Sequence, residues 1–299
     1  MHIPVLTNET IENLAPHQNE NFIDATCGFG GHAKLILEKT TPDGKLLAID
    51  QDIVALENAK KNLDEFGERV SFAHSNFDNL GLIIREWKVQ EVNGVLFDLG
   101  VSTYQLTSSE RGFSFLPRGK AGNQDSILDM RMSPESQKLS AQEIVNKWAE
   151  NDLKSILKKY GEEPFAAKIA QAIVFERKKQ PIIYTNQLVE VIKKALPPQY
   201  RINRQKHFAT STFRTLRMTV NNELKVLESG LKQGLQILSP GGRMVVISFH
   251  SLEDRIVKNF FRDNPNLKVV TNKPVIASEE EINNNPKARS AKLRCAIKI

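Results

Sequence analysis

The stretch Asp24-Ala-Thr-Cys-Gly28-Phe-Gly30-Gly31-His32 decides the fold. It contains the end of Phe22-Ile23-Asp24, a short apolar run typical of a buried strand, and leads into residues 32–39, where apolar side chains recur at helical spacing. Glycines between a strand and a helix let the backbone approach a ligand closely, and the start of a helix offers free N–H groups. The stretch therefore predicts a strand, a ligand-binding loop and a helix.

Strand and helix patterns alternate through the first hundred residues. Residues 45–50, 70–74 and 92–99 read as further strands, and residues 52–66 read as a helix. The last of these strands is almost wholly apolar, as expected of a strand covered on both faces. This alternation predicts a parallel, doubly wound, Rossmann-like α/β sheet.

The alternation is interrupted in the middle of the chain. Residues 107–209 contain a turn-rich loop at 118–125 and amphipathic helices at 141–148, 152–159, 165–178 and 185–196, with no convincing strand. A long helix is predicted at 212–238, a strand at 243–249, a helix at 254–262, and strands at 267–275 and 292–299. We therefore expect a core of residues 1–106 and 210–299, with an inserted small helical domain at 107–209.

Composition limits the class of protein. The chain has 299 residues, of which 40% are hydrophobic and 25% charged, as in ordinary globular proteins. Cys27 and Cys295 form no C-x-x-C pair, so we expect packing roles for both and no metal site. The N-terminus lacks a signal-peptide pattern, and no apolar run approaches the ~20 residues of a membrane helix. We therefore expect a cytoplasmic protein without membrane contact.

The glycine loop fits two kinds of cofactor. Gly28-Phe-Gly30-Gly-His-Ala33 matches the dinucleotide pattern G-x-G-x-x-A, and Asp50 closes the next strand at about the ~20-residue spacing of a ribose-binding acid. The loop and Asp50 alone therefore leave a nicotinamide cofactor and S-adenosylmethionine open.

Two further carboxylates favour S-adenosylmethionine. Asp24 ends the first strand, where an anion suits a pyrophosphate poorly. Asp98 ends the fourth strand, at the edge of the sheet where ligands bind in open α/β folds. Asp24, Asp50 and Asp98 should therefore converge on one crevice, and three carboxylates suit a ligand that carries a sulfonium and an ammonium group. Phe77, after the third strand, either lies against an adenine ring or packs in the core.

Eight segments, in this order, resemble one family. The chain resembles the bacterial ribosomal RNA small subunit methyltransferase H family from about residue 2 to the C-terminus. The segments are Asp24-Ala-Thr-Cys-Gly-Phe-Gly-Gly-His32, Leu46-Leu-Ala-Ile-Asp50-Gln-Asp52, Phe97-Asp-Leu-Gly-Val-Ser102, Glu110-Arg-Gly-Phe-Ser-Phe115, Leu128-Asp-Met-Arg-Met132, Tyr160-Gly-Glu-Glu163, Ile247-Ser-Phe-His-Ser-Leu-Glu-Asp-Arg255 and Asn285-Pro-Lys-Ala-Arg-Ser290.

The resemblance implies an S-adenosylmethionine-dependent methyltransferase that methylates the exocyclic N4 of one cytidine in the decoding region of 16S rRNA. It implies a class I methyltransferase core with a small inserted helical domain that recognises RNA, and 16S rRNA or the small ribosomal subunit as partner. It favours Phe77 as a cofactor contact. The implied cofactor-binding residues are Gly30, Gly31, His32, Asp50, Phe77, Asp98 and Gln105.

The chain also departs from the family pattern. Residues 116–127 replace a short Asp-Gly-Pro turn, Ser133 replaces an acid, and Phe208 and Ser211 replace Pro and Arg. These changes cluster in and beside the insertion, so they affect the expected substrate contacts more than the cofactor site.

The catalytic residue stays unassigned by the sequence. Many amino-methyltransferases carry Asp/Asn/Ser-Pro-Pro-aromatic after the fourth strand, but this chain reads Asp98-Leu-Gly-Val. Candidates for orienting the acceptor amine are Asp98, Ser102 and residues 248–254. Within that segment, His250 and Asp254 either orient the amine or act as helix-capping and supporting residues.

Positive charge gathers in two segments that flank the predicted crevice. With a net charge of +6, such segments indicate contacts with RNA phosphates or a solvated basic surface. The oligomeric state stays open, with a dimer as one option. The alternative functions are a nicotinamide-dependent oxidoreductase and a non-catalytic RNA-binding assembly factor. The basic residues are Arg201, Arg204, Lys206, Arg214 and Arg217, and then Lys287, Arg289, Lys292, Arg294 and Lys298.

Overall fold

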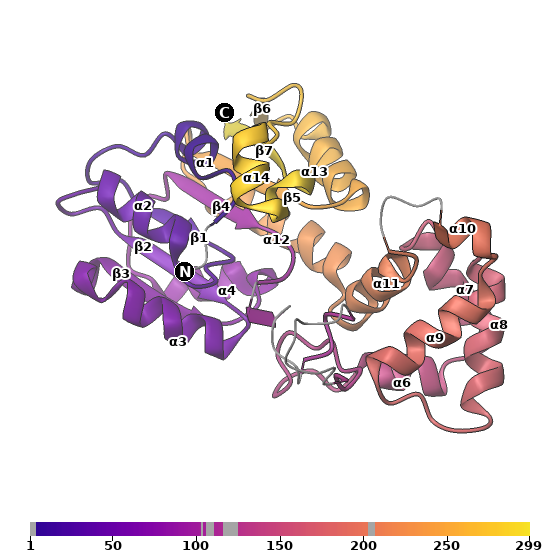
Figure 1. The fold of residues 1–299 in the computed structure, drawn as a ribbon. Helices are drawn as coiled ribbons and strands as arrows, with labels where there is room; N and C mark the ends of the chain where they lie inside the picture. The colour runs from indigo at the N-terminus through magenta and orange to yellow at the C-terminus, as the bar shows by residue number, and fades with distance from the viewer. Residues whose placement is uncertain (1–3, 103, 106–110, 116–124, 203–206) are drawn as a thin grey trace. The chain divides into compact units, whose positions relative to one another are not determined.

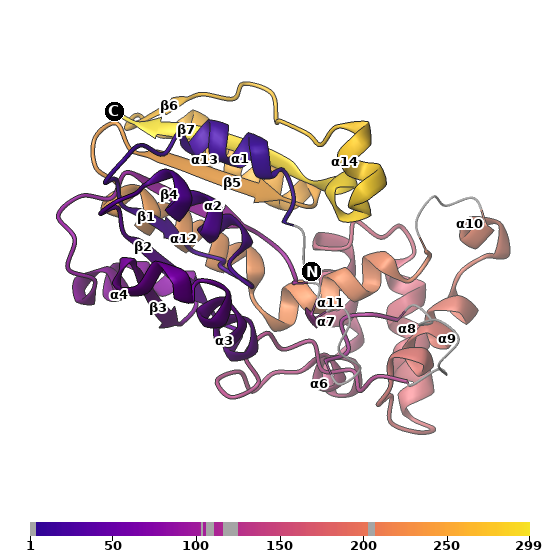
Figure 2. The ribbon, with the colours of Figure 1, turned by 60° about the vertical axis from the view of Figure 1, so that its left-hand side comes forward.

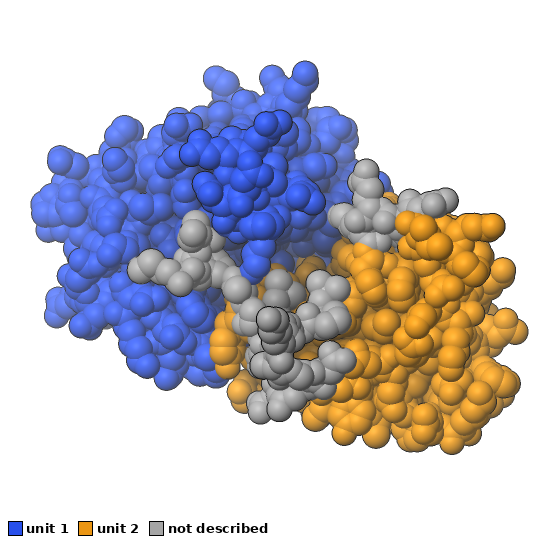
Figure 3. All heavy atoms as spheres, viewed as in Figure 1, with its two compact units in different colours: residues 1–100, 224–299 blue, residues 101–223 orange. Residues whose placement is uncertain are grey.

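The computed structural model describes residues 4–102, 104–105, 111–115, 125–202 and 207–299. The chain forms two compact units, which Figure 3 shows in different colours. Residues 1–100 and 224–299 make up the first unit, and residues 101–223 make up the second.

A seven-stranded sheet is the centre of the first unit (Figures 1 and 2). Its order is β3-β2-β1-β4-β5-β7-β6, and only β7 runs antiparallel to its neighbours β5 and β6. The expected Rossmann-like α/β sheet is confirmed. The strands are β1 (Phe22–Asp24), β2 (Leu46–Asp50), β3 (Val70–His74), β4 (Gly94–Asp98), β5 (Arg243–Ser248), β6 (Leu267–Val269) and β7 (Lys292–Lys298).

One expected strand is wrong over most of its length. The structure ends β6 at Val269, whereas the sequence predicts a strand to residue 275. Val275 pairs with Leu293 only as an isolated bridge. Lys273-Pro274 lies just before that bridge, and proline lacks the N–H that a continuous ladder needs.

Helices cover both faces of this sheet, because successive strand residues point to opposite sides. Ile36 and Leu37 pack with Phe22 and Leu96 on one face, whereas Leu231 packs with Ile23 and Phe97 on the other. The helices are α1 (Thr7–Leu14), α2 (Gly31–Lys39), α3 (Ile53–Asn62), α4 (Leu80–Glu86), α12 (Glu223–Ile237), α13 (Ser251–Asp263) and α14 (Glu279–Asn284), with 3-10 turns at Asp64–Arg69, Phe77–Asn79 and Pro286–Ser290.

The second unit is helical and has its own apolar core. Leu128, Ile144, Leu157, Ile169 and Leu188 are fully buried within it. In its described residues, pairing between extended segments is limited to one isolated bridge, between Ile127 and Tyr184. Its helices are α6 (Ala141–Lys147), α7 (Glu150–Lys159), α8 (Ala166–Arg177), α9 (Thr185–Ala195), α10 (Pro198–Ile202) and α11 (Thr210–Val220).

The long helix expected at 212–238 is in fact two helices. α11 ends at Val220 and α12 begins at Glu223. The Asn221 side chain accepts a hydrogen bond from the Met132 amide at 2.9 Å and donates one to the Met130 carbonyl at 2.8 Å. Asn222 adopts a left-handed conformation with φ 51°. These contacts tie α11 to the second unit, which is why that unit extends beyond the expected 107–209.

Both cysteines are buried free thiols, as a packing role requires. Among the described residues, no helix has both the length and the apolar character needed to span a membrane.

Candidate cofactor site at the carboxyl edge of the sheet

Three aspartates end neighbouring strands of the first unit. Asp24 ends β1, Asp50 ends β2 and Asp98 ends β4. β1 lies between β2 and β4, and both pairings are parallel, so all three carboxylates stand at the same edge of the sheet. The shared edge matches the expectation, and a ligand crevice there stays a prediction.

The glycine loop is bonded to Asp50. One carboxylate oxygen of Asp50 accepts from the Gly28 amide and the other from the Asp52 amide, each at 2.8 Å. Gly30 has φ 85°, a left-handed conformation that disfavours a side chain. A Cβ at Gly31 would lie 2.8 Å from the Pro4 ring. Asp50 therefore fixes the loop at Gly28, and Gly31 leaves room for the Pro4 ring.

Thr26 links the first strand to the fourth. Its hydroxyl oxygen accepts a hydrogen bond from the Asp98 amide at 2.6 Å, and its own amide donates to the Asp24 carboxylate at 3.2 Å. Thr26 is not among the site residues predicted from the sequence. Its position two residues after a strand-ending Asp was the available signal, since such an Asp commonly accepts from the amide two residues on.

Burial raises the pKa of two of the three carboxyl groups. Burial raises the pKa of Asp24 to about 7, although His32 and the Thr26 amide oppose this shift. Burial likewise raises the pKa of Asp50 to about 6, against the two backbone hydrogen bonds that it accepts. A cationic ligand would favour the ionised form of both groups. The electrostatics of the crevice therefore fit a ligand with positive charge.

His32 and Asp98 carry polar atoms that lack partners. His32 lies in the first turn of α2, is 4% exposed, and has its Nε2 3.6 Å from an Asp98 oxygen. Among the described residues, neither ring nitrogen of His32 has a hydrogen-bond partner, and the same holds for Oδ1 of Asp98. Buried polar atoms of this kind are costly unless a ligand pairs with them. These atoms therefore fit a polar ligand in the crevice.

Phe77 packs in the core, which is one of the two roles that the sequence allows for it. Its ring meets Phe97 edge to face with centroids 5.4 Å apart. A Cβ at Gly230 would lie 2.5 Å from the same ring, so α12 depends on a glycine there to approach it. The ring remains partly exposed. The core contact does not test a second contact with an adenine ring, which stays a prediction.

Gln105 belongs to the second unit. It is buried, its amide donates to the Ser102 hydroxyl at 3.2 Å, and its side-chain oxygen accepts from the Ser102 amide at 3.1 Å. Both residues therefore shape the start of that unit, and their roles toward cofactor and acceptor stay predictions.

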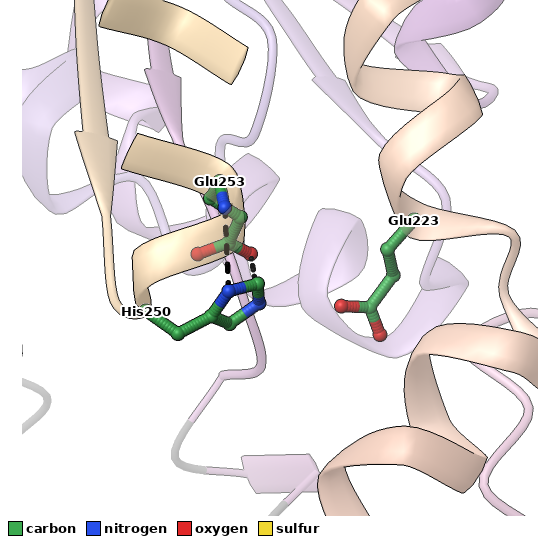
Figure 4. Close-up of side chains that lie close together, drawn as sticks. All are labelled: Glu223, His250 and Glu253. Carbon is green, nitrogen blue, oxygen red and sulfur yellow. Dashed lines mark hydrogen bonds and ion pairs between the residues drawn. The ribbon is translucent and has the colours of Figure 1, made fainter. Parts of the chain in front are cut away.

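The segment at 248–254 serves the fold of the first unit. Nδ1 of His250 accepts from the Glu253 amide at 3.3 Å, and its Nε2 lies 3.1 Å from the Glu253 carboxylate (Figure 4). Glu253 also accepts from the Phe249 amide at 2.9 Å. These contacts cap α13. Asp254 accepts from Arg294 at 2.6 Å, so both residues have supporting roles.

Several residues of the basic segments are also used internally. Arg294 is buried against Asp254, and Lys298 donates to the Leu238 carbonyl at 2.6 Å. Arg217 pairs with Glu223 through two 2.8 Å hydrogen bonds. Arg289 is exposed. Arg204 and Lys206 lie outside the described residues.

Comparison with known proteins identifies the family. The model of the MraW methylase family matches residues 1–299. The chain belongs to the MraW methylase family. A protein named ribosomal RNA small subunit methyltransferase H from Trichormus variabilis is 50% identical over 99% of this chain and 92% of its own length. A protein of the same name from Thermosipho melanesiensis is 47% identical, and the match covers 100% of this chain and 98% of its own length.

A solved rRNA methylase from Streptococcus thermophilus is 11% identical, with a TM-score of 0.42, and the match covers 98% of this chain and 93% of that one. The sequence matches therefore carry the family assignment.

Family membership confirms the resemblance seen in the sequence. The chain is a methyltransferase, and its cofactor is S-adenosylmethionine. The oxidoreductase and assembly-factor alternatives are set aside. The site in the first unit fits this cofactor. Burial raises the pKa of Asp24 and Asp50, and a sulfonium and an ammonium group would supply positive charge that favours their ionised forms.

Proposed function

We propose that this MraW-family methyltransferase methylates the exocyclic N4 of one cytidine in the decoding region of 16S rRNA. The observation that carries the proposal is the edge of the sheet where Asp24, Asp50 and Asp98 end their strands, beside the His32 ring, whose nitrogens lack hydrogen-bond partners among the described residues. The names of the curated relatives support a small-subunit rRNA as substrate. An rRNA substrate in turn supports a cytoplasmic location.

We assign the cofactor to seven residues. Gly30 and Gly31 would let the backbone at the start of α2 come close to it, and Asp50 would supply a carboxylate for its ribose hydroxyls. Phe77 presents the exposed part of its ring to the adenine. The other members of the set are His32, Asp98 and, from the second unit, Gln105.

The bound cofactor supplies a methyl group on a positively charged sulfur. N4 of cytosine is a weak nucleophile, since its lone pair is delocalised into the ring. The chain must therefore hold the amine in line with the methyl group and accept hydrogen bonds from it as it becomes tetrahedral. Asp98 is placed for this at the end of β4, with Oδ1 unpartnered among the described residues. No proton has to leave before the methyl moves, so the reaction needs no strong base.

Recognition of RNA is assigned to the inserted unit. The target cytidine has to leave its stack to enter the crevice, which favours a single-stranded or loop region of the RNA. The helical unit of residues 101–223 interrupts the core between β4 and α12, directly after Asp98 in the chain. That connection supports a role for this unit in holding RNA.

The test compares two substrates. Small ribosomal subunits and naked 16S rRNA from a strain without the gene are incubated with the protein and S-adenosylmethionine, and nucleosides are measured by mass spectrometry. N4-methylcytidine should be missing from that strain and appear after incubation with one or both substrates. An unchanged N4-methylcytidine signal in the deletion strain contradicts the proposal.

A further inference from the structure

The side chain of His32 has a place in the crevice that backbone contacts with a cofactor do not explain. It is 4% exposed, and both its ring nitrogens lack a hydrogen-bond partner within the described part of the chain. A buried histidine that serves only the fold bonds at least one nitrogen, because leaving both unpaired costs about 1–3 kcal/mol for each atom. The ring is therefore positioned for a partner that binds later.

The charged surroundings of the ring show what it can act upon. Asp98 faces its Nε2 at 3.6 Å, which is within the range of an ion pair and beyond that of a hydrogen bond. Asp24 interacts electrostatically with the ring from β1, and Asp50 faces Asp24 from β2. Lys287, in the 3-10 turn before β7, is attracted to Asp98. Asp98 therefore has His32 beside one oxygen and interacts electrostatically with Lys287.

The two oxygens of Asp98 have different environments. Oδ2 is the one beside His32, and Oδ1 is buried without a partner in the described residues. A carboxylate can only accept hydrogen bonds. It therefore favours a base with an amine at position 4, as in cytosine, and repels one with a carbonyl there, as in uracil. A site that bonds a substrate N–H rejects the analogue without it strongly.

We propose that the side chain of His32 positions Asp98 so that Oδ1 accepts a hydrogen bond from the N4 amine, which selects cytosine over uracil. This inference rests on the proposed function. The amine lone pair forms the bond to the methyl carbon while the carbon–sulfur bond breaks and its electron pair stays on sulfur. The nitrogen then gives one N–H proton to Asp98, and solvent takes it later. Asp98 touches the reacting amine, and His32 is a positioning residue.

The binding test uses the full chain with S-adenosylhomocysteine bound. Cytidine and uridine 5′-monophosphate are titrated by calorimetry or NMR into wild type, His32→Asn and His32→Gln. His32→Asn should weaken cytidine monophosphate by about tenfold and leave the uridine nucleotide unchanged. His32→Gln, whose amide reaches the position of Nε2, should keep most of the preference. His17→Asn is the matched control, because His17 is exposed before β1.

The kinetic test uses RNA. His32→Asn should lower kcat by about 100-fold with little change in KM for RNA. The double variant with Asp98→Asn should lose little more than Asp98→Asn alone, because His32 acts through Asp98. The inference is overturned if His32→Asn leaves both kcat and the nucleotide preference unchanged. It is also overturned if His32→Asn weakens the binding of both nucleotides and of S-adenosylhomocysteine equally. Wild type that makes no N4-methylcytidine overturns the proposed function instead.

Discussion

A buried acid of the second unit and two buried groups of the first unit have different polar surroundings. In the second unit, Glu163 is 2% exposed and accepts from the Ser211 hydroxyl at 2.5 Å, the Tyr200 hydroxyl at 2.9 Å and the Phe165 amide at 3.2 Å. In the first unit, Asp24 and His32 are similarly buried, but burial dominates the pKa of Asp24 and the ring of His32 lacks described partners. The hydrogen bonds to Glu163 stabilise the second unit, whereas the His32 ring nitrogens are left for a ligand of the proposed cofactor site.

The largest expected effect concerns Asp24. Its pKa is about 7 in the folded protein against 3.8 ordinarily, so the folded state binds more protons than the unfolded state between these values. This contribution to stability is full below about pH 4 and is lost as pH rises through about 7. Asp24→Asn removes the dependence, and at pH 8 it should raise the free energy of unfolding by at most about 4 kcal/mol.

Urea unfolding of the cofactor-free protein at pH 4.5 and pH 8 measures this difference. Asp43→Asn, at an exposed site, is the control. The same Asp24→Asn variant should bind S-adenosylmethionine more weakly, because it has lost a negative charge. A stability gain of equal size at both pH values would show that Asp24 is not the titrating group.

Glu163→Ala should lower the stability of the protein and leave its affinity for the cofactor unchanged, whereas Asp24→Asn should raise stability and weaken the cofactor. It removes a buried acceptor of three hydrogen bonds from described residues, so the free energy of unfolding should fall by about 3 kcal/mol. Affinity for S-adenosylmethionine should stay within about twofold of wild type, since the first unit holds most of the proposed contacts. Thermal melting and calorimetry measure the two quantities, with the exposed Glu190→Ala as control. A large loss of cofactor affinity contradicts the comparison between the units.

Asp50→Ala should weaken S-adenosylmethionine by about 100-fold and leave RNA affinity almost unchanged. The variant loses the proposed ribose contact and the hydrogen bonds that hold Gly28 and Asp52. Calorimetry with the cofactor and filter binding with 16S rRNA give the two affinities, and Asp64→Ala is an exposed control. Equal loss of both affinities would mean that Asp50 acts mainly on the fold.

Arg289→Ala should have the smallest effect. Arg289 is exposed beside the half-buried Lys287, whereas Arg294 is bonded to Asp254. Loss of one phosphate contact should weaken RNA about threefold and lower the slope of log K against log salt by about 0.7–0.9. Arg262→Ala, at an exposed ion pair with Asp263, is the control. An unchanged slope would remove Arg289 from the RNA surface.

Local patterns predicted the sheet closely. The expected strands at 22–24 and 70–74 are observed with the same bounds. Those at 45–50, 243–249 and 292–299 differ by one residue at one end, and the one at 92–99 is shorter by two residues at its start and one at its end. Strands buried on both faces are nearly continuous apolar runs, which are readable without tertiary context. The short helices α1, α4 and α14 were not predicted, because fewer than nine residues give a weak periodic signal.

Contacts between distant residues account for what the sequence did not reveal. The break at Asn221 depends on the Met130 and Met132 backbone about ninety residues earlier. Ser211, which departs from the family pattern, is bonded to Glu163 inside the second unit. Arg294 was predicted to belong to a basic surface, but it is buried and bonded to Asp254, forty residues earlier.

The sheet, the glycine loop and the three strand-ending carboxylates follow from the order of the residues, because strand period and turn residues are local properties of the chain. Which polar residues find hydrogen-bond partners within the chain depends on the folded arrangement. The sequence motifs do not show that His32 and His250 have different roles. In the structure, His250 caps α13, whereas His32 lies beside Asp98. The difference arises from burial and from partners far away in sequence, which no local pattern encodes.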